Sequence, residues 1–225
     1  MTKLTKFSVS QIADQLEKPF SMANVVHVGD IIVNVYVCQG MVQWHKHLDI
    51  DELFWVYEGT ILLESDWGEV RLRPGDLAVV PKGIGHRSSS GLRASVLLMR
   101  CDFFPDRKNG RRRLYAIPGE EKLERVSLRD MAQKSPALSQ FQTVAQIEDS
   151  VVQVARGEGN WPVHIPAPHD RLLYVLEGTA TVRTFRSMLH MHPGDFTLVP
   201  RGAEFQLNST RGTVLVQVTR EHEPE

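Results

Sequence analysis

Four side chains in the first hundred residues have the types and spacing of a metal site. His45 and His47 are separated by one residue in an apolar run, and a strand would turn both to the same face. Glu52 follows a short acidic stretch and precedes a second strand-like run, Leu53 to Tyr57, which could bring it back beside the histidines. Two imidazoles and a carboxylate aimed at one point favour a divalent metal with open coordination positions.

His86 is the fourth candidate ligand, and it ends the segment GDLAVVPKGIGH, residues 75–86. In this segment a strand that looks buried, Leu77 to Val80, runs into a turn at Pro81-Lys82-Gly83. The residues around the first two histidines and Glu52 are mostly apolar, and an unpaired carboxylate is costly in such surroundings. A bound cation would remove that cost, so we favour metal binding over a surface location for these residues.

The two segments resemble the two signature motifs of the cupin superfamily, G-x-H-x-H-E-G and G-x-P-x-G-x-H at their characteristic spacings. The first motif matches from Gly40 to Gly59, with four residues between Gly40 and the first histidine where five is commoner. The second matches from Gly75 to the final histidine and then departs, because Ser90 stands where the family often has Asn.

The resemblance implies a site for one divalent transition metal, Fe, Mn, Ni, Co or Zn. The ligands that it implies are His45, His47, Glu52 and His86. Asp49 and Asp51 are interpreted as loop acids, because Glu52 alone has the family spacing to Gly59.

The second half of the chain repeats the first at an offset of 119 residues. Gly40, His45 and Gly59 correspond to Gly159, His164 and Gly178, and Pro74-Gly75-Asp76 corresponds to Pro193-Gly194-Asp195. The chain therefore resembles a bicupin, an all-β protein of two tandem double-stranded β-helix (jelly-roll) barrels with a few short helices. We predict an N-terminal metal-binding domain at residues 1–105, a linker at 106–125 and a degenerate C-terminal domain at 126–225.

Each repeat is expected to begin with a short helix followed by two strands. The first helix would be capped by Ser8 or Ser10 and end before Pro19, and the second would span Leu128 to Lys134. The predicted strands are Val25–Val28, Ile31–Cys38, Thr143–Ile147 and Val151–Ala155.

The second repeat does not keep the four ligands. Their counterparts are His164, Pro166, Arg171 and Phe205, of which the last three cannot ligate a metal. We therefore expect no metal in the C-terminal domain. Arg171 near His164 could bind a carboxylate or phosphate, but we prefer that Phe205 fills the old cavity while Arg171 reaches solvent or pairs with an acid. Three further histidines of this half fall outside the pattern and are interpreted as surface or loop residues: His169, His190 and His192.

Strand parity suggests which residues line a pocket beside the metal. Met41 and Gln43 share a face with the first two histidines, and Phe54 and Val56 share the face of Glu52, unless a β-bulge inverts the pattern. The pocket would be mostly apolar with a few polar groups, as sites for small molecules usually are.

The composition of the chain indicates which binding partners and which cellular compartment to expect. The formal net charge is −1, which gives no electrostatic reason to expect nucleic acid or a membrane as partner. Arg111-Arg112-Arg113 is interpreted as part of a solvated linker, because acidic residues follow it. The start of the chain lacks the apolar segment of a signal peptide, and two cysteines make no disulfide framework, so a cytoplasmic protein is expected. We also expect a small-molecule substrate and a possible homodimer.

Three functions fit these features. The first is a metal-dependent enzyme acting on a small organic molecule, most plausibly an Fe(II) or Mn(II) dioxygenase. The second is a non-redox isomerase or lyase acting on a sugar or keto acid, for which the sequence indicates no proton-transferring residue. The third is a non-catalytic protein that binds a small molecule. Fold alone does not separate them.

Overall fold

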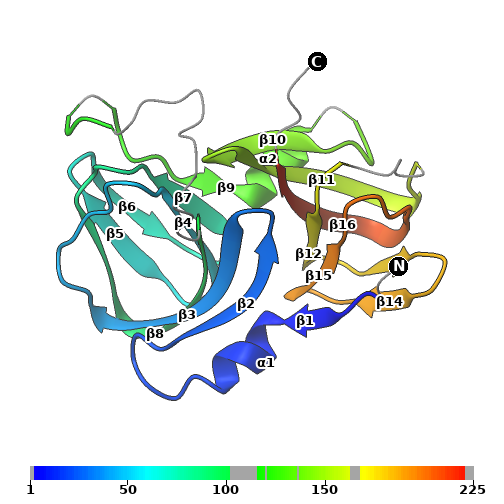
Figure 1. The fold of residues 1–225 in the computed structure, drawn as a ribbon, viewed down its shortest axis with the longest axis horizontal. Coiled ribbons are helices and arrows are strands. Elements are labelled where there is room, and N and C mark those ends of the chain that lie inside the picture. The colour runs from blue at the N-terminus through cyan, green and yellow to red at the C-terminus, as the bar shows by residue number, and fades with distance from the viewer. Residues whose placement is uncertain (1–2, 102–115, 120, 136, 163–167, 221–225) are drawn as a thin grey trace. The chain divides into compact units, whose positions relative to one another are not determined.

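The computed structural model of the chain describes residues 3–101, 116–119, 121–135, 137–162 and 168–220. The chain forms two compact units (Figure 1). Unit 1 consists of Met1–Val9, Leu128–Ala145 and Ser150–Glu225, and unit 2 consists of Ser10–Ser127 and Gln146–Asp149.

Unit 2 contains an eight-stranded antiparallel sheet in the order β2-β3-β8-β4-β7-β9, with β5 joining β8 to β6. The long strand β8 pairs with β3, β4 and β5 in turn, which wraps the sheet around one interior (Figure 1). The strands are β2 (Met22–Val28), β3 (Ile31–Met41), β4 (Glu52–Glu58), β5 (Ile61–Ser65), β6 (Gly68–Leu72), β7 (Asp76–Val80), β8 (His86–Cys101) and β9 (Val126–Ser127).

The interior of unit 2 follows from the two-residue period of a strand. Alternate residues of the three central strands belong to one buried apolar cluster, including Tyr36 and Cys38 of β3, Phe54 of β4, and Val96 and Leu98 of β8. β3 and β8 pair without a register shift from Ile31 to Cys38, so the alternation holds along this whole stretch.

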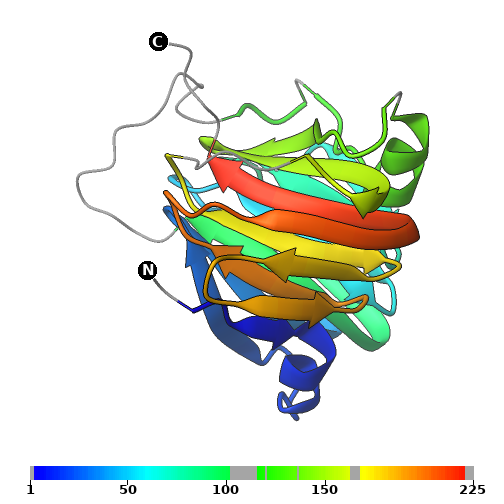
Figure 2. The ribbon, with the colours of Figure 1, turned by 90° about the vertical axis from the view of Figure 1, so that its right-hand side faces the viewer.

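Unit 1 has an equivalent sheet in the order β1-β15-β12-β16-β11-β10, with β13 joining β16 to β14. Figure 2 shows the long strand β16 lying among its neighbours. The strands are β1 (Lys6–Ser8), β10 (Gln142–Ile147), β11 (Ser150–Asn160), β12 (Arg171–Glu177), β13 (Ala180–Arg183), β14 (Met188–Met191), β15 (Asp195–Val199) and β16 (Gln206–Arg220). Two antiparallel β sheets confirm the predicted all-β fold of tandem barrels.

The first strand of each repeat completes the sheet of the other repeat. β1 pairs with β15, with Lys6 opposite Thr197, and β9 pairs with β7, with Leu77 opposite Val126. The offset of 119 residues makes these pairings equivalent. The predicted ranges 1–105 and 126–225 do not contain this exchange: Met1–Val9 belongs to unit 1 and Gln146–Asp149 to unit 2. Most of the predicted linker, including the arginine run, lies outside the described residues.

Both predicted helices form. α2 spans Leu128–Lys134, as predicted, and α1 spans Val9–Asp14, stopping before the predicted limit at Pro19. The backbone after α1 tightens, because the amides of Gln15 and Leu16 donate to the carbonyls three residues back. Among the described residues no helix is long and apolar enough to cross a membrane.

Gly59 closes the turn between β4 and β5 and cannot accept a side chain. Its φ is +79°, and a Cβ atom built there would lie 2.8 Å from the Cα of Ala94 and from the carbonyl oxygen of Arg93. We expect Gly59→Ala to lower the free energy of unfolding by at least about 1–3 kcal/mol, because it combines left-handed strain with a backbone clash.

Denaturant unfolding would measure this loss. Gly91→Ala is the matched control, because nothing lies within 4 Å of a Cβ at Gly91. Equal stability of the two variants would show that the close approach at Gly59 is not what requires a glycine.

Candidate metal centre

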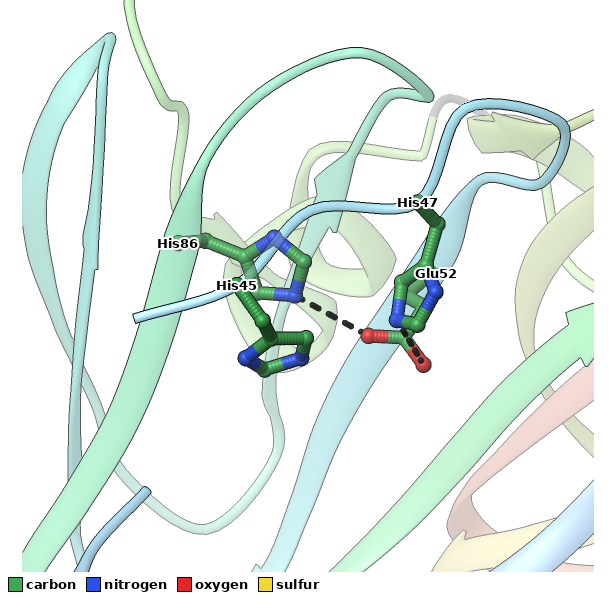
Figure 3. A group of neighbouring side chains, drawn as sticks. All are labelled: His45, His47, Glu52 and His86. Atoms are coloured by element: carbon green, nitrogen blue, oxygen red, sulfur yellow. Dashed lines mark hydrogen bonds and ion pairs between the residues drawn. The ribbon is translucent and has the colours of Figure 1, made fainter. Parts of the chain in front are cut away.

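The four predicted ligands come together in unit 2. One ligand atom from each of His45, His47, Glu52 and His86 lies within 4.8 Å of the other three. Figure 3 shows these side chains gathered around one point, with Glu52 between His47 and His86. Glu52 begins β4 and His86 begins β8, whereas His45 and His47 lie in the segment between β3 and β4. This cluster could bind a metal ion.

The prediction that His45 and His47 lie on a strand is wrong. β3 ends at Met41, and His45 makes only an isolated antiparallel bridge with His86. A register shift lies between Cys38 and Gly40, and the regular pairing of β3 with β8 then continues only as far as Met41, opposite Ser89. Two backbone hydrogen bonds between His45 and His86, of 2.8 and 3.0 Å, still hold this segment beside β8.

Backbone carbonyls set the tautomers of two histidines. The Nδ1 atom of His45 is 2.8 Å from the carbonyl oxygen of Gln43, and that of His86 is 3.1 Å from the carbonyl oxygen of Ile84. A carbonyl only accepts, so each Nδ1 carries a proton and donates it. The Nε2 atoms are then left to ligate a metal, which is the usual arrangement around metal-bound histidine.

The close contact between His86 and Glu52 would be stabilised by a cation. The Nε2 atom of His86 lies 3.0 Å from Oε2 of Glu52, in a site where both side chains are almost fully buried. With Nδ1 already the donor, a neutral His86 and an ionised Glu52 would present two acceptors to each other. Either a second proton on the imidazole or a metal ion relieves this, so the residues present fit a bound metal.

The carboxylate of Glu52 is held in its ionised form. Burial raises the pKa of Glu52, but hydrogen bonds from His47 and His86 outweigh burial and lower that pKa from 4.5 to about 2. The hydrogen bond to Glu52 likewise raises the pKa of His47 above 6.5, against the opposing effect of burial. The raised pKa of His47 therefore favours a protonated imidazole beside Glu52 in the metal-free protein.

Comparison with known proteins identifies the family. The Cupin domain family matches residues 32–95, which contain both motifs and all four clustered residues. A relative from Bacillus subtilis (strain 168), the uncharacterized protein YdbB, is 35% identical over 83 residues, covering 36% of this chain and 74% of the relative. The chain belongs to the cupin superfamily.

Solved structures extend the similarity to both repeats of this cupin. The Cupin 2 conserved barrel domain protein from Leptotrichia buccalis matches 98% of each chain with a TM-score of 0.74 at 8% identity. The salicylate 1,2-dioxygenase from Pseudaminobacter salicylatoxidans matches 96% of this chain and 84% of its own, with a TM-score of 0.72 at 12% identity. At these identities the similarity concerns the fold, which is that of a bicupin.

Acid should weaken metal binding to this cupin through His47. Because its pKa is raised in the folded state, its contribution to the stability of the metal-free protein is full below pH 6.5 and lost as the pH rises through the raised value. The contribution of Glu52 is present above pH 4.5 and lost as the pH falls towards about 2. A metal displaces the proton of His47, so we expect affinity to fall by about tenfold per pH unit below its pKa.

Zn(II) competition titrations on both sides of pH 6.5 would measure how the metal affinity depends on pH. Denaturant unfolding of the metal-free protein would measure how its stability depends on pH. As the pH rises, the free energy of unfolding of the metal-free protein should lose the contribution of His47. Over the same pH range the affinity for zinc should rise. A zinc affinity that does not change with pH would contradict the link.

A buried cluster of charged side chains lies next to the motif segments, and the sequence did not indicate it. Asp51, interpreted as a loop acid, does lie in a loop but is only 3% exposed. Its carboxylate accepts the amides of Lys82 (3.0 Å) and Glu148 (3.1 Å), and the Nζ atom of Lys82 lies 3.1 Å from Oε2 of Glu148. Because Glu148 is 97 residues from Asp51, no local pattern could have indicated this contact.

The predicted pocket residues differ in their surroundings. Phe54 and Val56 are buried in the apolar cluster of unit 2, and the ring of Phe54 lies edge-on to that of His86 at 5.9 Å. Met41 and Gln43 are exposed, and Gln43 contributes through the carbonyl that orients His45. The role of the four as a pocket lining stays a prediction.

The second cupin repeat is described at two of its four counterpart positions. The guanidinium of Arg171 lies 5.8 Å from the ring centre of Phe205, which is 2% exposed within the apolar cluster of unit 1. Burial lowers the pKa of Arg171. His164 and Pro166 lie outside the described residues, so the absence of metal here stays a prediction. His190 and His192 are exposed, as expected for surface histidines.

Proposed function

We propose that this bicupin is a metal-dependent enzyme that acts on a small organic molecule, with an Fe(II) or Mn(II) dioxygenase-type reaction. The observation that carries the proposal is the convergence of three histidines and one buried, ionised glutamate on one point. Four protein ligands leave one or two positions open on a six-coordinate metal. When bound, a redox-active metal would hold O₂ beside the organic substrate and relay electrons from that substrate to O₂.

The residues of the chain provide the rest of the site. The carbonyls of Gln43 and Ile84 orient two histidines, and Glu52 supplies the negative charge. Phe54 and the apolar cluster below it exclude water from one side of the metal position. The shared fold with a salicylate 1,2-dioxygenase supports this reaction class without identifying the substrate.

A non-redox isomerase or lyase is the second candidate, favoured by Tyr36. Its side chain belongs to the interior cluster, and its hydroxyl oxygen lies 3.4 Å from the Oγ atom of Ser88, two residues after His86. Burial raises the pKa of Tyr36 well above 10, so the phenol stays protonated and able to donate. A buried phenol that stays protonated can donate a hydrogen bond to negative charge that develops on a substrate.

Metal content and oxygen consumption test the proposal together. Untagged protein purified without added metal should contain about one equivalent of iron or manganese per chain. The loaded protein should consume O₂ in step with substrate, without an added reductant, and the zinc-loaded form should not. Substrate turnover by the zinc form without O₂ would favour the isomerase or lyase. Failure to bind any metal after reconstitution would reject the enzyme and leave a binding protein.

A further inference from the structure

Arg100 is a positively charged side chain beside the four clustered residues. It is not one of the four candidate metal ligands. On β8 it lies directly opposite Glu52 of β4, and its Nη1 atom is 3.7 Å from Oε1 of Glu52. Two and four residues earlier on the same strand, Leu98 and Val96 belong to the interior cluster. Arg100 therefore points towards the barrel interior, with its side chain 34% exposed.

A bound metal would leave the positive charge of Arg100 uncompensated. In the metal-free geometry Glu52 faces His47, His86 and Arg100 together. Once the carboxylate ligates a divalent ion, the ion, Glu52 and Arg100 sum to two positive charges, because neutral imidazoles add none. Among the described residues Glu52 is the only ion-pair partner of Arg100, so a bound metal would leave Arg100 able to pair with an anion from solution.

Neither of the neighbouring acids forms an ion pair with Arg100. Asp51 is turned to the amides of Lys82 and Glu148, and Asp49 is exposed in the loop before Glu52. A partly buried site whose charges sum to a positive value favours an anionic ligand.

Asn34 adds a buried acceptor to the same face. It lies on β3 two residues from Tyr36, opposite Leu98, and is fully buried. Its Nδ2 atom donates to the carbonyl of Leu98 (3.2 Å), which fixes the orientation of the amide. The Oδ1 atom then has no hydrogen-bond partner among the described residues. A buried acceptor left in this way is costly unless a ligand or water donates to it.

We infer that the metal site takes a small organic acid and that Arg100 binds its carboxylate. The inference rests on the proposed function, which it extends by naming the substrate class. A planar guanidinium suits a carboxylate, and partial exposure lets Arg100 turn from Glu52 to the ligand. Arg100 thereby selects acids over neutral molecules of the same shape.

The preference for acids can be tested by binding alone, by comparing the affinity of a carboxylic acid with that of the corresponding amide. The probes are 2-hydroxybenzoate with 2-hydroxybenzamide, and lactate with lactamide. Each is titrated into the Co(II)-loaded protein while the visible absorption of the metal is followed. At least one acid should bind about tenfold or more tightly than its amide.

Variants assign the preference to Arg100. We expect Arg100→Gln to bring acid and amide to similar affinities at unchanged metal content, and Arg100→Lys to retain part of the preference. Arg71→Gln removes an exposed cation of β6 and should change nothing. An acid preference that survives Arg100→Gln, or no preference for either acid in the unaltered protein, would overturn the inference.

These outcomes are separate from those of the proposed function. An Arg100-dependent acid preference without oxygen consumption by the iron or manganese form would reject the dioxygenase and leave the inference standing. Oxygen consumption with neutral substrates and no acid preference would reject the inference alone.

Discussion

Glu52→Gln will remove most of the metal bound by unit 2. An amide is neutral and a poor ligand, and the substitution also discards the one negative charge among the four clustered residues. Outer-shell changes alone typically cost 10–100-fold in metal affinity, so loss of this inner carboxylate should cost more than about 100-fold. Elemental analysis and competition titration with a chelator would both show the loss.

Asp49→Asn is the matched control for that experiment. It removes a carboxylate three residues from Glu52 but from an exposed position outside the cluster. Metal content should stay that of the unaltered protein. If Glu52→Gln kept its metal while Asp49→Asn lost it, the ligand assignment would be wrong.

Breaking the ion pair between Lys82 and Glu148 will destabilise the protein more than any surface charge change. Both side chains are 5% exposed, and removing one partner leaves the other charge buried and uncompensated. We expect Lys82→Met to lower the free energy of unfolding by about 3–5 kcal/mol in denaturant titrations. Glu148→Gln should act in the same direction.

A double variant and a surface pair make this prediction specific. Lys82→Met combined with Glu148→Gln should cost less than the sum of the single changes, because neither charge remains. The partly exposed pair of Arg87 and Glu64 is the control, since solvent reaches both side chains and screens their charges, despite hydrogen bonds of 2.7 and 2.8 Å. Fully additive single changes would show that the buried charges do not depend on each other.

The clustering of the four candidate ligands could be predicted from the sequence, because the spacing of these residues along the chain is a local signal. His45, His47 and Glu52 lie within eight residues, and the turn before His86 has its own pattern of Pro and Gly. The bounds of α2 and the start of β3 followed equally from local signals. The same local reasoning was wrong about the strand at His45, because the end of β3 at Met41 depends on its pairing with β8.

Contacts between distant segments could not be predicted. Nothing near Glu148 in the sequence indicates that its side chain meets Lys82, 66 residues earlier. The 119-residue repeat predicts two similar sheets, but a repeated strand has the same pattern whichever sheet receives it. For that reason the exchange of β1 and β9 was not expected. Arg100 also escaped notice, because its nearness to Glu52 arises only from the register of β4 and β8.

The exchanged first strands have a consequence for biosynthesis. The sheet of unit 2 needs Val126–Ser127, so this barrel cannot be completed until more than half of the chain has left the ribosome. The sheet of unit 1 needs Lys6–Ser8, which are synthesised long before the Asp195–Val199 strand with which they pair. Such long sequence separations slow folding and leave strand edges open in the meantime. A nascent chain stalled before residue 126 would therefore present an incomplete metal-binding barrel to chaperones.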